Sequence, residues 1–141
     1  MLDLIIKNGA CYIDKELKDQ DIAIKNGKII KIGKTEEESK EIFDAKGLMV
    51  LPGCIDTQTH FREPGSTDTE DLNSGSRAAI VGGITSVFEM PNTNPPTSTK
   101  VEFQKKLDLA KNRMYCNYAF YFGATADNAN ELADLVNLEG C

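Results

Sequence analysis

The sequence predicts an α/β fold in which a β-rich segment precedes alternating strands and helices. In residues 2–50, short apolar runs flank Asn8-Gly9 and Asn26-Gly27. Asn-Gly between alternating apolar residues is a strong hairpin signal, because both turn residues adopt positive φ. From residue 52 onward, strand-like and helix-like runs alternate, which is typical of βα units that form a parallel sheet.

The second segment is expected to contain three strands, each followed by a helix. Two capping boxes mark helix starts: Thr67 with Glu70, and Thr99 with Glu102. Gly82-Gly83 is expected to end the first helix. The strands are expected at residues 54–60, 84–90 and 114–124, and the helices at residues 69–83, 99–113 and 126–136.

The length of the chain bounds how much of such a fold it can contain. Residues 1–51 are expected to form an N-terminal β-sandwich segment, and residues 52–141 the first βα units of a barrel. A complete (β/α)8 barrel takes about 250 residues, so the second segment has room for about three of the eight units. The second segment is therefore either a small open three-layer domain or the front part of a larger protein. We expect the second, an incomplete barrel that is inactive when isolated.

The charge balance and the apolar runs of the sequence limit the kinds of partner that we expect. Acidic residues outnumber basic ones, 22 to 16, for a formal net charge of −6, which argues against nucleic acid or an anionic membrane as partner. No apolar run approaches the ~20 residues of a spanning helix. The N-terminus lacks the apolar core of a signal peptide, so we expect a cytoplasmic protein whose four cysteines are free thiols.

The first strand of the second segment carries the polar residues of most interest. Asp56, Gln58 and His60 alternate along it, so they are expected to share one face. His60, the only histidine, falls at the carboxyl end of this strand, where βα folds assemble their active sites. A lone histidine is more often structural, but its position at a strand end, close to Arg62, favours a functional role.

Two further residues have both an ordinary and a functional interpretation. Arg62 is either a plain surface charge or a bidentate clamp for a substrate carboxylate. Asn92, after the second strand, taken alone is better explained as a turn cap. Paired with Arg62 at the same end of the sheet, it makes an anion and amide recognition site.

The stretches "LPGCIDTQTHFREPG" and "GSRAAIVGGITSVFEMPNTNPPT" resemble dihydroorotases, within the cyclic amidohydrolase group of the amidohydrolase superfamily. The resemblance is most specific at residues 60–65 and 90–93. It implies the N-terminal part of a TIM-like (β/α)8 metal-dependent hydrolase barrel preceded by a small β-sandwich segment. It also implies zinc, one or two ions, and the reversible cyclisation of N-carbamoyl-L-aspartate to dihydroorotate in pyrimidine biosynthesis.

The same resemblance assigns roles to individual residues. His60 matches the second histidine of the metal motif, and Arg62 and Asn92 match the pair that holds the substrate carboxylate. Gln58 replaces the expected first histidine, and an amide oxygen is a poor zinc ligand beside an imidazole. The catalytic residue and the remaining ligands are expected on later strands, outside this chain.

A competing hypothesis belongs to another class of protein. Because Gln58 stands where a metal ligand is expected, the chain could belong to a catalytically silent dihydroorotase homologue that serves as structural partner of aspartate transcarbamoylase. Intact Arg62 and Asn92 favour the enzyme, since a scaffold has no use for a carboxylate clamp. A homo-oligomer is the other association expected.

Overall fold

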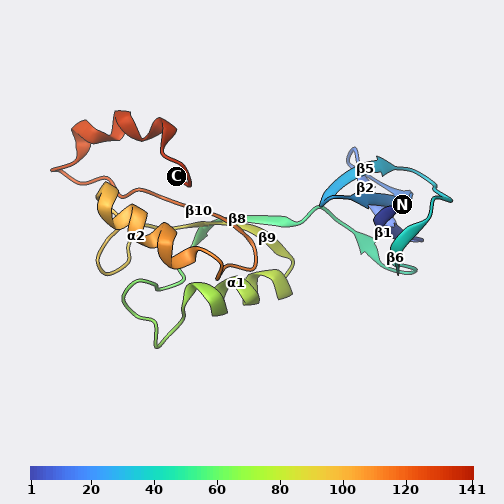
Figure 1. Ribbon diagram of the computed structural model, residues 1–141, viewed down its shortest axis with the longest axis horizontal. Helices are drawn as coiled ribbons and strands as arrows, with labels where there is room; N and C mark the ends of the chain where they lie inside the picture. The colour runs from blue at the N-terminus through green and yellow to red at the C-terminus, as the bar shows by residue number, and fades with distance from the viewer. The chain divides into compact units, whose positions relative to one another are not determined.

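The computed structural model describes residues 1–141, except for the side chain of Val136 (Figure 1). The chain forms two compact units, Met1–Pro52 and Gly53–Cys141. Each unit has its own cluster of buried apolar residues. In the part of the chain that the structure describes, no helix has the length and hydropathy needed to cross a membrane.

The first unit consists of two small sheets. One has the strand order β5-β4-β1-β6 and the other the order β3-β2-β7. Its core gathers Leu2, Ile5 and Ala23, all nearly inaccessible to solvent. The strands are β1 (Leu2–Lys7), β2 (Ala10–Ile13), β3 (Glu16–Asp19), β4 (Ile22–Lys25), β5 (Lys28–Ile32), β6 (Ser39–Asp44) and β7 (Met49–Val50).

The two Asn-Gly pairs behave differently. Asn26 and Gly27 have φ of 51° and 70° and join the antiparallel strands β4 and β5, which confirms that hairpin. The hairpin predicted at Asn8-Gly9 is wrong, because β1 and β2 belong to different sheets. Gly9 serves a packing purpose instead: a Cβ there would lie 2.6 Å from Val50 Cγ2, so only glycine fits.

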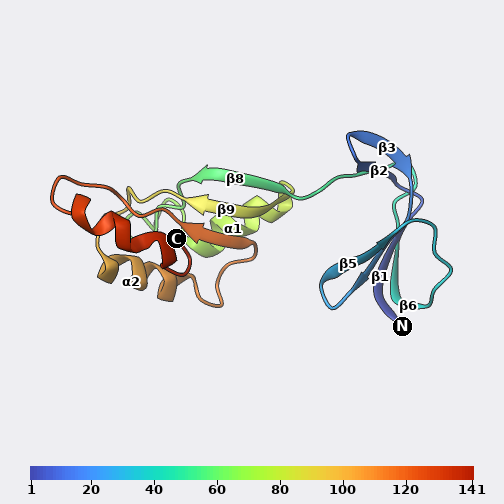
Figure 2. The same ribbon diagram turned by 90° about the horizontal axis from the view of Figure 1, so that it is seen from above.

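The second unit confirms the alternation of strands and helices. Its three strands form a parallel sheet in the order β10-β9-β8, seen from above in Figure 2. The described residues do not form a closed barrel. The third helix, expected at residues 126–136, is a 3-10 helix that begins at Ala129. The elements are β8 (Cys54–Thr59), α1 (Leu72–Val81), β9 (Ile84–Glu89), α2 (Lys100–Ala110), β10 (Asn117–Phe120) and η1 (Ala129–Asn137).

The core of the second unit lies between the sheet and the two α-helices. Leu72 of α1, Val87 of β9, Phe103 of α2 and Phe120 of β10 are each no more than 1% exposed and belong to one cluster. The rings of Phe103 and Phe120 meet edge to face, with centroids 6.4 Å apart. This packing fixes the carboxyl ends of the strands, where the candidate residues lie.

The helix caps differ in part from the prediction. Thr99 caps α2 as expected, its Oγ1 accepting a hydrogen bond from the Glu102 backbone N–H. The box predicted at Thr67 and Glu70 is wrong. Helix α1 begins later, and Asp71 and Ser74 form its capping box. The intervening residues are held in turns by hydrogen bonds such as that from the Ser66 N–H to the Arg62 carbonyl oxygen, 2.9 Å.

Candidate functional site

The end of β8 does not follow the simple alternation of a strand. Asp56 pairs with Val87 and Thr59 pairs with Glu89, so β8 has one more residue than β9 over this stretch. Asp56 Oδ1 also accepts a hydrogen bond from the Gln58 N–H, 2.9 Å. A bulge breaks the two-residue period of a strand. Alternation therefore does not establish that Asp56, Gln58 and His60 share one face, and that shared face stays a prediction.

His60 follows β8 directly and contacts the loop after β9. Its Nδ1 lies 2.9 Å from Asn92 Oδ1. An amide oxygen only accepts hydrogen bonds, so this contact requires the proton on Nδ1, which in a neutral ring leaves the lone pair on Nε2. The backbone supports this contact, because the Met90 N–H donates to the Thr59 carbonyl oxygen at 2.9 Å. The structure therefore brings together two of the residues that the sequence singled out.

Arg62 is exposed to solvent. Its φ is 61°, a left-handed conformation that residues other than glycine seldom adopt. Its two neighbours hold it there: Phe61 is 7% exposed and Glu63 is 6% exposed. Among the described residues, its guanidinium has no hydrogen bond or ion pair, so all its donors are free for a ligand.

Glu63 is a structural residue of the site that sequence reasoning missed. Its carboxylate accepts two hydrogen bonds from Arg113, at 2.8 and 3.0 Å. It also accepts one from the Leu72 N–H at the start of α1, 2.9 Å. The hydrogen bonds from the Arg113 guanidinium to the Glu63 carboxylate raise the pKa of Arg113. Glu63 thus fastens the loop of residues 60–71 to the start of α1 and to Arg113, which follows α2. Arg113 lies 50 positions further along the sequence, so no local pattern connects the two residues.

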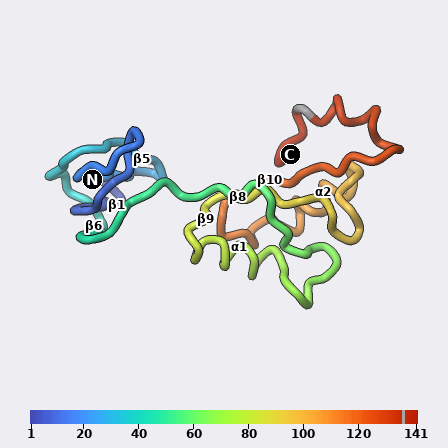
Figure 3. Tube along the Cα trace, turned by 180° about the vertical axis from the view of Figure 1, so that it is seen from behind, coloured from blue at the N-terminus to red at the C-terminus, as the bar shows by residue number. Residues whose placement is uncertain are grey.

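The loops after β8 and β9 pack directly against each other. The Asn94 N–H donates to the Pro64 carbonyl oxygen at 2.9 Å. Gly65 has φ 126°, and a Cβ there would lie 3.0 Å from Asn94 Cβ. The close approach requires glycine at position 65. Figure 3 traces both loops, the first in green and the second in yellow.

The described residues do not by themselves fit a zinc ion. They contain no group of three or more His, Cys, Asp or Glu side chains placed to hold a metal, whereas catalytic zinc takes three protein ligands. His60 offers one imidazole, and Gln58 offers only an amide. A zinc site that includes His60 needs ligands from residues other than those described.

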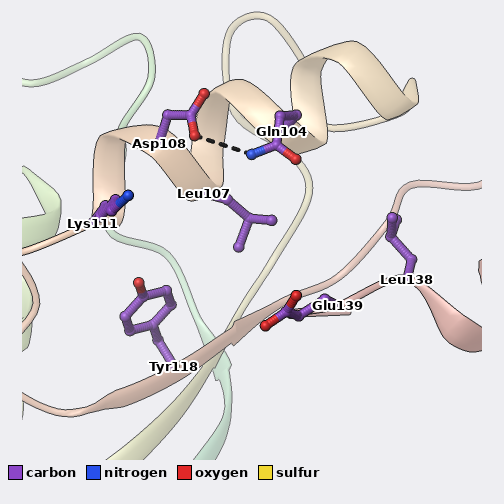
Figure 4. Close-up of a pocket in the computed structure, with 8 residues that line it drawn as sticks. Gln104, Leu107, Asp108, Lys111, Tyr118, Leu138 and Glu139 are labelled. Carbon is purple, nitrogen blue, oxygen red and sulfur yellow. Dashed lines mark hydrogen bonds between the residues drawn. The ribbon is translucent and has the colours of Figure 1, made fainter.

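A cavity of about 520 Å³ lies elsewhere in the second unit (Figure 4). One side is formed by α2, where Gln104 donates to Asp108 at 3.0 Å, and the other by Tyr118 and residues 138–140. None of its lining residues belongs to the loops of residues 60–71 and 90–99. The cavity is therefore separate from His60 and contributes nothing to this site.

Comparison with known proteins identifies the family. Residues 49–138 match the model of the Amidohydrolase family. Allantoinase from Salmonella choleraesuis (strain SC-B67) is 42% identical over 134 residues, covering 94% of this chain and 30% of the allantoinase. Allantoinase from Escherichia coli (strain K12 / DH10B) has the same identity and coverage. The chain thus spans about a third of the length of these relatives.

Solved structures lead to the same group. L-Hydantoinase (dihydropyrimidinase) from Arthrobacter aurescens superposes with a TM-score of 0.87 at 32% identity, over 96% of this chain and 31% of that one. A D-hydantoinase superposes with a TM-score of 0.82 at 33% identity, over 99% of this chain and 32% of that one.

These relatives refine the resemblance found in the sequence. They carry the names allantoinase and hydantoinase rather than dihydroorotase, so they support the cyclic amidohydrolase group without supporting that one substrate. The family match covers most of the second unit, including His60, Arg62 and Asn92. The chain belongs to the Amidohydrolase family.

Proposed function

We propose that this chain supplies the first part of the active site of a cyclic amide hydrolase, and that its substrate ring bears a carboxylate, with dihydroorotate the first candidate. The observation that carries the proposal is the contact between His60 and Asn92, in the loops that follow two adjacent parallel strands. Arg62, with an uncommitted guanidinium, lies in the first of these loops. The carboxyl ends of parallel strands are where such folds bind ligands.

The donors available at this edge suit an anionic substrate. The guanidinium of Arg62 is a planar fork that matches a carboxylate. Asn92 commits its oxygen to His60, which leaves the two N–H groups of its amide to donate to substrate oxygen atoms. Together they supply hydrogen bonds of the kind that fix the carboxylate of dihydroorotate or of N-carbamoyl-L-aspartate.

Zinc is part of the proposal for the whole protein, meaning this chain together with the sequence that completes the length of its relatives. An N-acyl-D-glutamate deacylase from Bordetella bronchiseptica, solved with zinc, shares the fold with a TM-score of 0.65 at 19% identity. In this chain His60 is the candidate ligand, with Nε2 bearing the free lone pair. The other ligands and the catalytic residue lie outside the described residues.

Allantoin is the second candidate substrate. The 42% identity with allantoinase extends over 94% of this chain, whereas the argument for dihydroorotate depends on Arg62 and Asn92 alone. The competing non-catalytic role, as structural partner of aspartate transcarbamoylase, draws on Gln58, which stands where the resemblance expects a metal-ligating histidine.

A panel of ring substrates tests the proposal. The whole protein, loaded with zinc or treated with a chelator, is incubated separately with dihydroorotate, allantoin and a 5-substituted hydantoin, and the carbamoyl product is measured. The proposal expects zinc-dependent opening of dihydroorotate at the highest kcat/KM. Faster opening of allantoin favours the second candidate, and no opening of any ring by zinc-loaded protein favours the scaffold.

A further inference from the structure

A buried ion pair lies beside the candidate site. Glu89, at the carboxyl end of β9, and Lys106, in the middle of α2, pair with side chains only 1% and 0% exposed. The ammonium of Lys106 also donates to the Met90 carbonyl oxygen at 3.1 Å and to Thr97 Oγ1 at 3.3 Å. Its three donors thus have three acceptors, one of them charged and two in the loop after β9.

Stability is a weak reason for such a pair. Desolvation opposes both charges, because burial raises the pKa of Glu89 and lowers the pKa of Lys106. Replacing a buried ion pair by apolar side chains of similar volume is often neutral or stabilising. The two hydrogen bonds from Lys106 to the loop are what an apolar replacement cannot provide.

Those two hydrogen bonds bracket the segment that carries Asn92. Met90 begins the segment, residues 90–97, and Thr97 ends it. Thr97 closes the segment on itself: its N–H donates to the Pro91 carbonyl oxygen at 2.8 Å, and its Oγ1 lies 3.2 Å from Thr93 Oγ1. Lys106 of α2 therefore holds both ends of the segment that carries Asn92.

We propose that Lys106, charge-balanced by Glu89, is a positioning residue that holds residues 90–97 so that Asn92 Oδ1 faces His60 Nδ1. Lys106 has no hydrogen bond to either residue of that contact among the described residues, so it acts through the loop. This positioning role does not depend on which ring the whole protein opens. Its test measures the position of the proton on the His60 imidazole and does not require catalysis.

The test uses the single histidine as its own probe. Because the 141-residue chain contains one histidine, labelling with ¹⁵N-histidine gives imidazole signals from His60 alone. At a pH where the ring is neutral, the ¹⁵N shifts report which nitrogen carries the proton. The wild-type chain should show the proton on Nδ1, and Asn92→Ala provides the reference for a lost contact.

The deciding variant removes both charges at once. Glu89→Leu with Lys106→Met keeps the core apolar and filled, so the fold is expected to persist by circular dichroism. The proton should move from Nδ1 toward the mixture seen in Asn92→Ala. Lys105→Met is the matched control, because Lys105 is the neighbouring residue of α2 and pairs with Glu102 on the surface. It should leave the wild-type shifts unchanged.

The outcomes separate positioning from simple packing. A folded double variant whose ¹⁵N shifts equal those of wild type overturns the proposal, because the loop then holds Asn92 without Lys106. If the double variant does not fold, Thr97→Val decides, since it removes one loop acceptor and no charge. A shift toward the Asn92→Ala reference supports the positioning role, and unchanged shifts overturn it.

Discussion

His60 Nδ1 and Asn92 Oδ1 lie 2.9 Å apart, so the residue after β8 and the loop after β9 share a hydrogen bond. The contact gives Asn92 a different use from the one that the family resemblance implied. Its oxygen fixes the tautomer of His60, and only its N–H groups remain for a substrate. An imidazole whose Nδ1 is held in this way directs Nε2 toward a ligand, as the histidines of metal sites generally do.

Gln58→His tests whether position 58 weakens a metal site. If both side chains reach the same place, the second imidazole should raise the zinc occupancy of the whole protein, because imidazole is a better zinc ligand than an amide. Elemental analysis after mild chelation measures the occupancy. Occupancy equal to that of a His60→Ala control would mean that no metal site exists there, and full occupancy of the wild-type protein would mean that Gln58 does not weaken it.

Lys106→Met should destabilise the chain in a pH-dependent way. Removing one partner of a buried pair costs about 3–5 kcal/mol at neutral pH, because the Glu89 carboxyl is then buried without its partner. Burial already raises the pKa of Glu89 above its ordinary 4.5, so the folded variant retains a proton that the unfolded chain releases. Its stability should therefore be greatest below pH 4.5 and fall as pH rises through the folded-state pKa.

Urea unfolding across this pH range measures the effect of Lys106→Met. Lys105→Met, on the exposed face of the same helix, should cost no more than about 1 kcal/mol at any pH. A Lys106→Met variant that loses no more stability than this control at pH 7 would show that Glu89 has another partner.

Glu63→Gln tests the contact between Glu63 and Arg113, which holds the loop that carries Arg62. The substitution preserves shape but removes the charge that holds Arg113 by two hydrogen bonds. Hydrogen bonds to charged groups contribute about 1.5–3 kcal/mol, so the free energy of unfolding should fall by about that amount. Lys18→Gln, which breaks an exposed pair with Asp14, should cost less than about 1 kcal/mol. Equal losses of unfolding free energy in the two variants would contradict the claim that Glu63 holds this loop.

Gly75→Ala tests the packing of α1 against Phe61. A Cβ at position 75 would lie 2.5 Å from Phe61 Cδ1, and overpacking of this kind costs about 1–3 kcal/mol. Helix propensity returns only about 1 kcal/mol, so the net effect should be destabilising. At Gly82 the nearest atoms are 3.4 Å away, so Gly82→Ala should be neutral or slightly stabilising. A thermal melt in which both variants match wild type would contradict the packing.

The sequence predicted what depends on local chemistry. Asn26-Gly27 forms its hairpin because the two turn residues adopt the positive φ that this turn requires. Asn8-Gly9 has the same letters and forms none, because β1 pairs with β4 and β6 instead of β2. That choice of partner depends on contacts between residues far apart in the chain, which a short pattern does not contain.

The candidate site shows the same division. The rule that parallel strands end at one edge of a sheet predicts that His60 and Asn92 lie at the same end. The bulge between Asp56 and Thr59 was not predictable, because one extra residue leaves the polar pattern unchanged. The ion pairs of Glu63 and Glu89 join residues on separate elements, so no spacing in the sequence indicates them.

The kinetics of Arg62→Lys in the whole protein test the central claim most directly. Lysine keeps the charge but lacks the planar fork, so one hydrogen bond to a charged group is lost, at a cost of about 1.5–3 kcal/mol. The kcat/KM for dihydroorotate should therefore fall at least about 10-fold, while that for allantoin, which has no carboxylate, should change little. Unchanged kcat/KM for dihydroorotate would contradict the claim that this edge of the sheet binds a carboxylate.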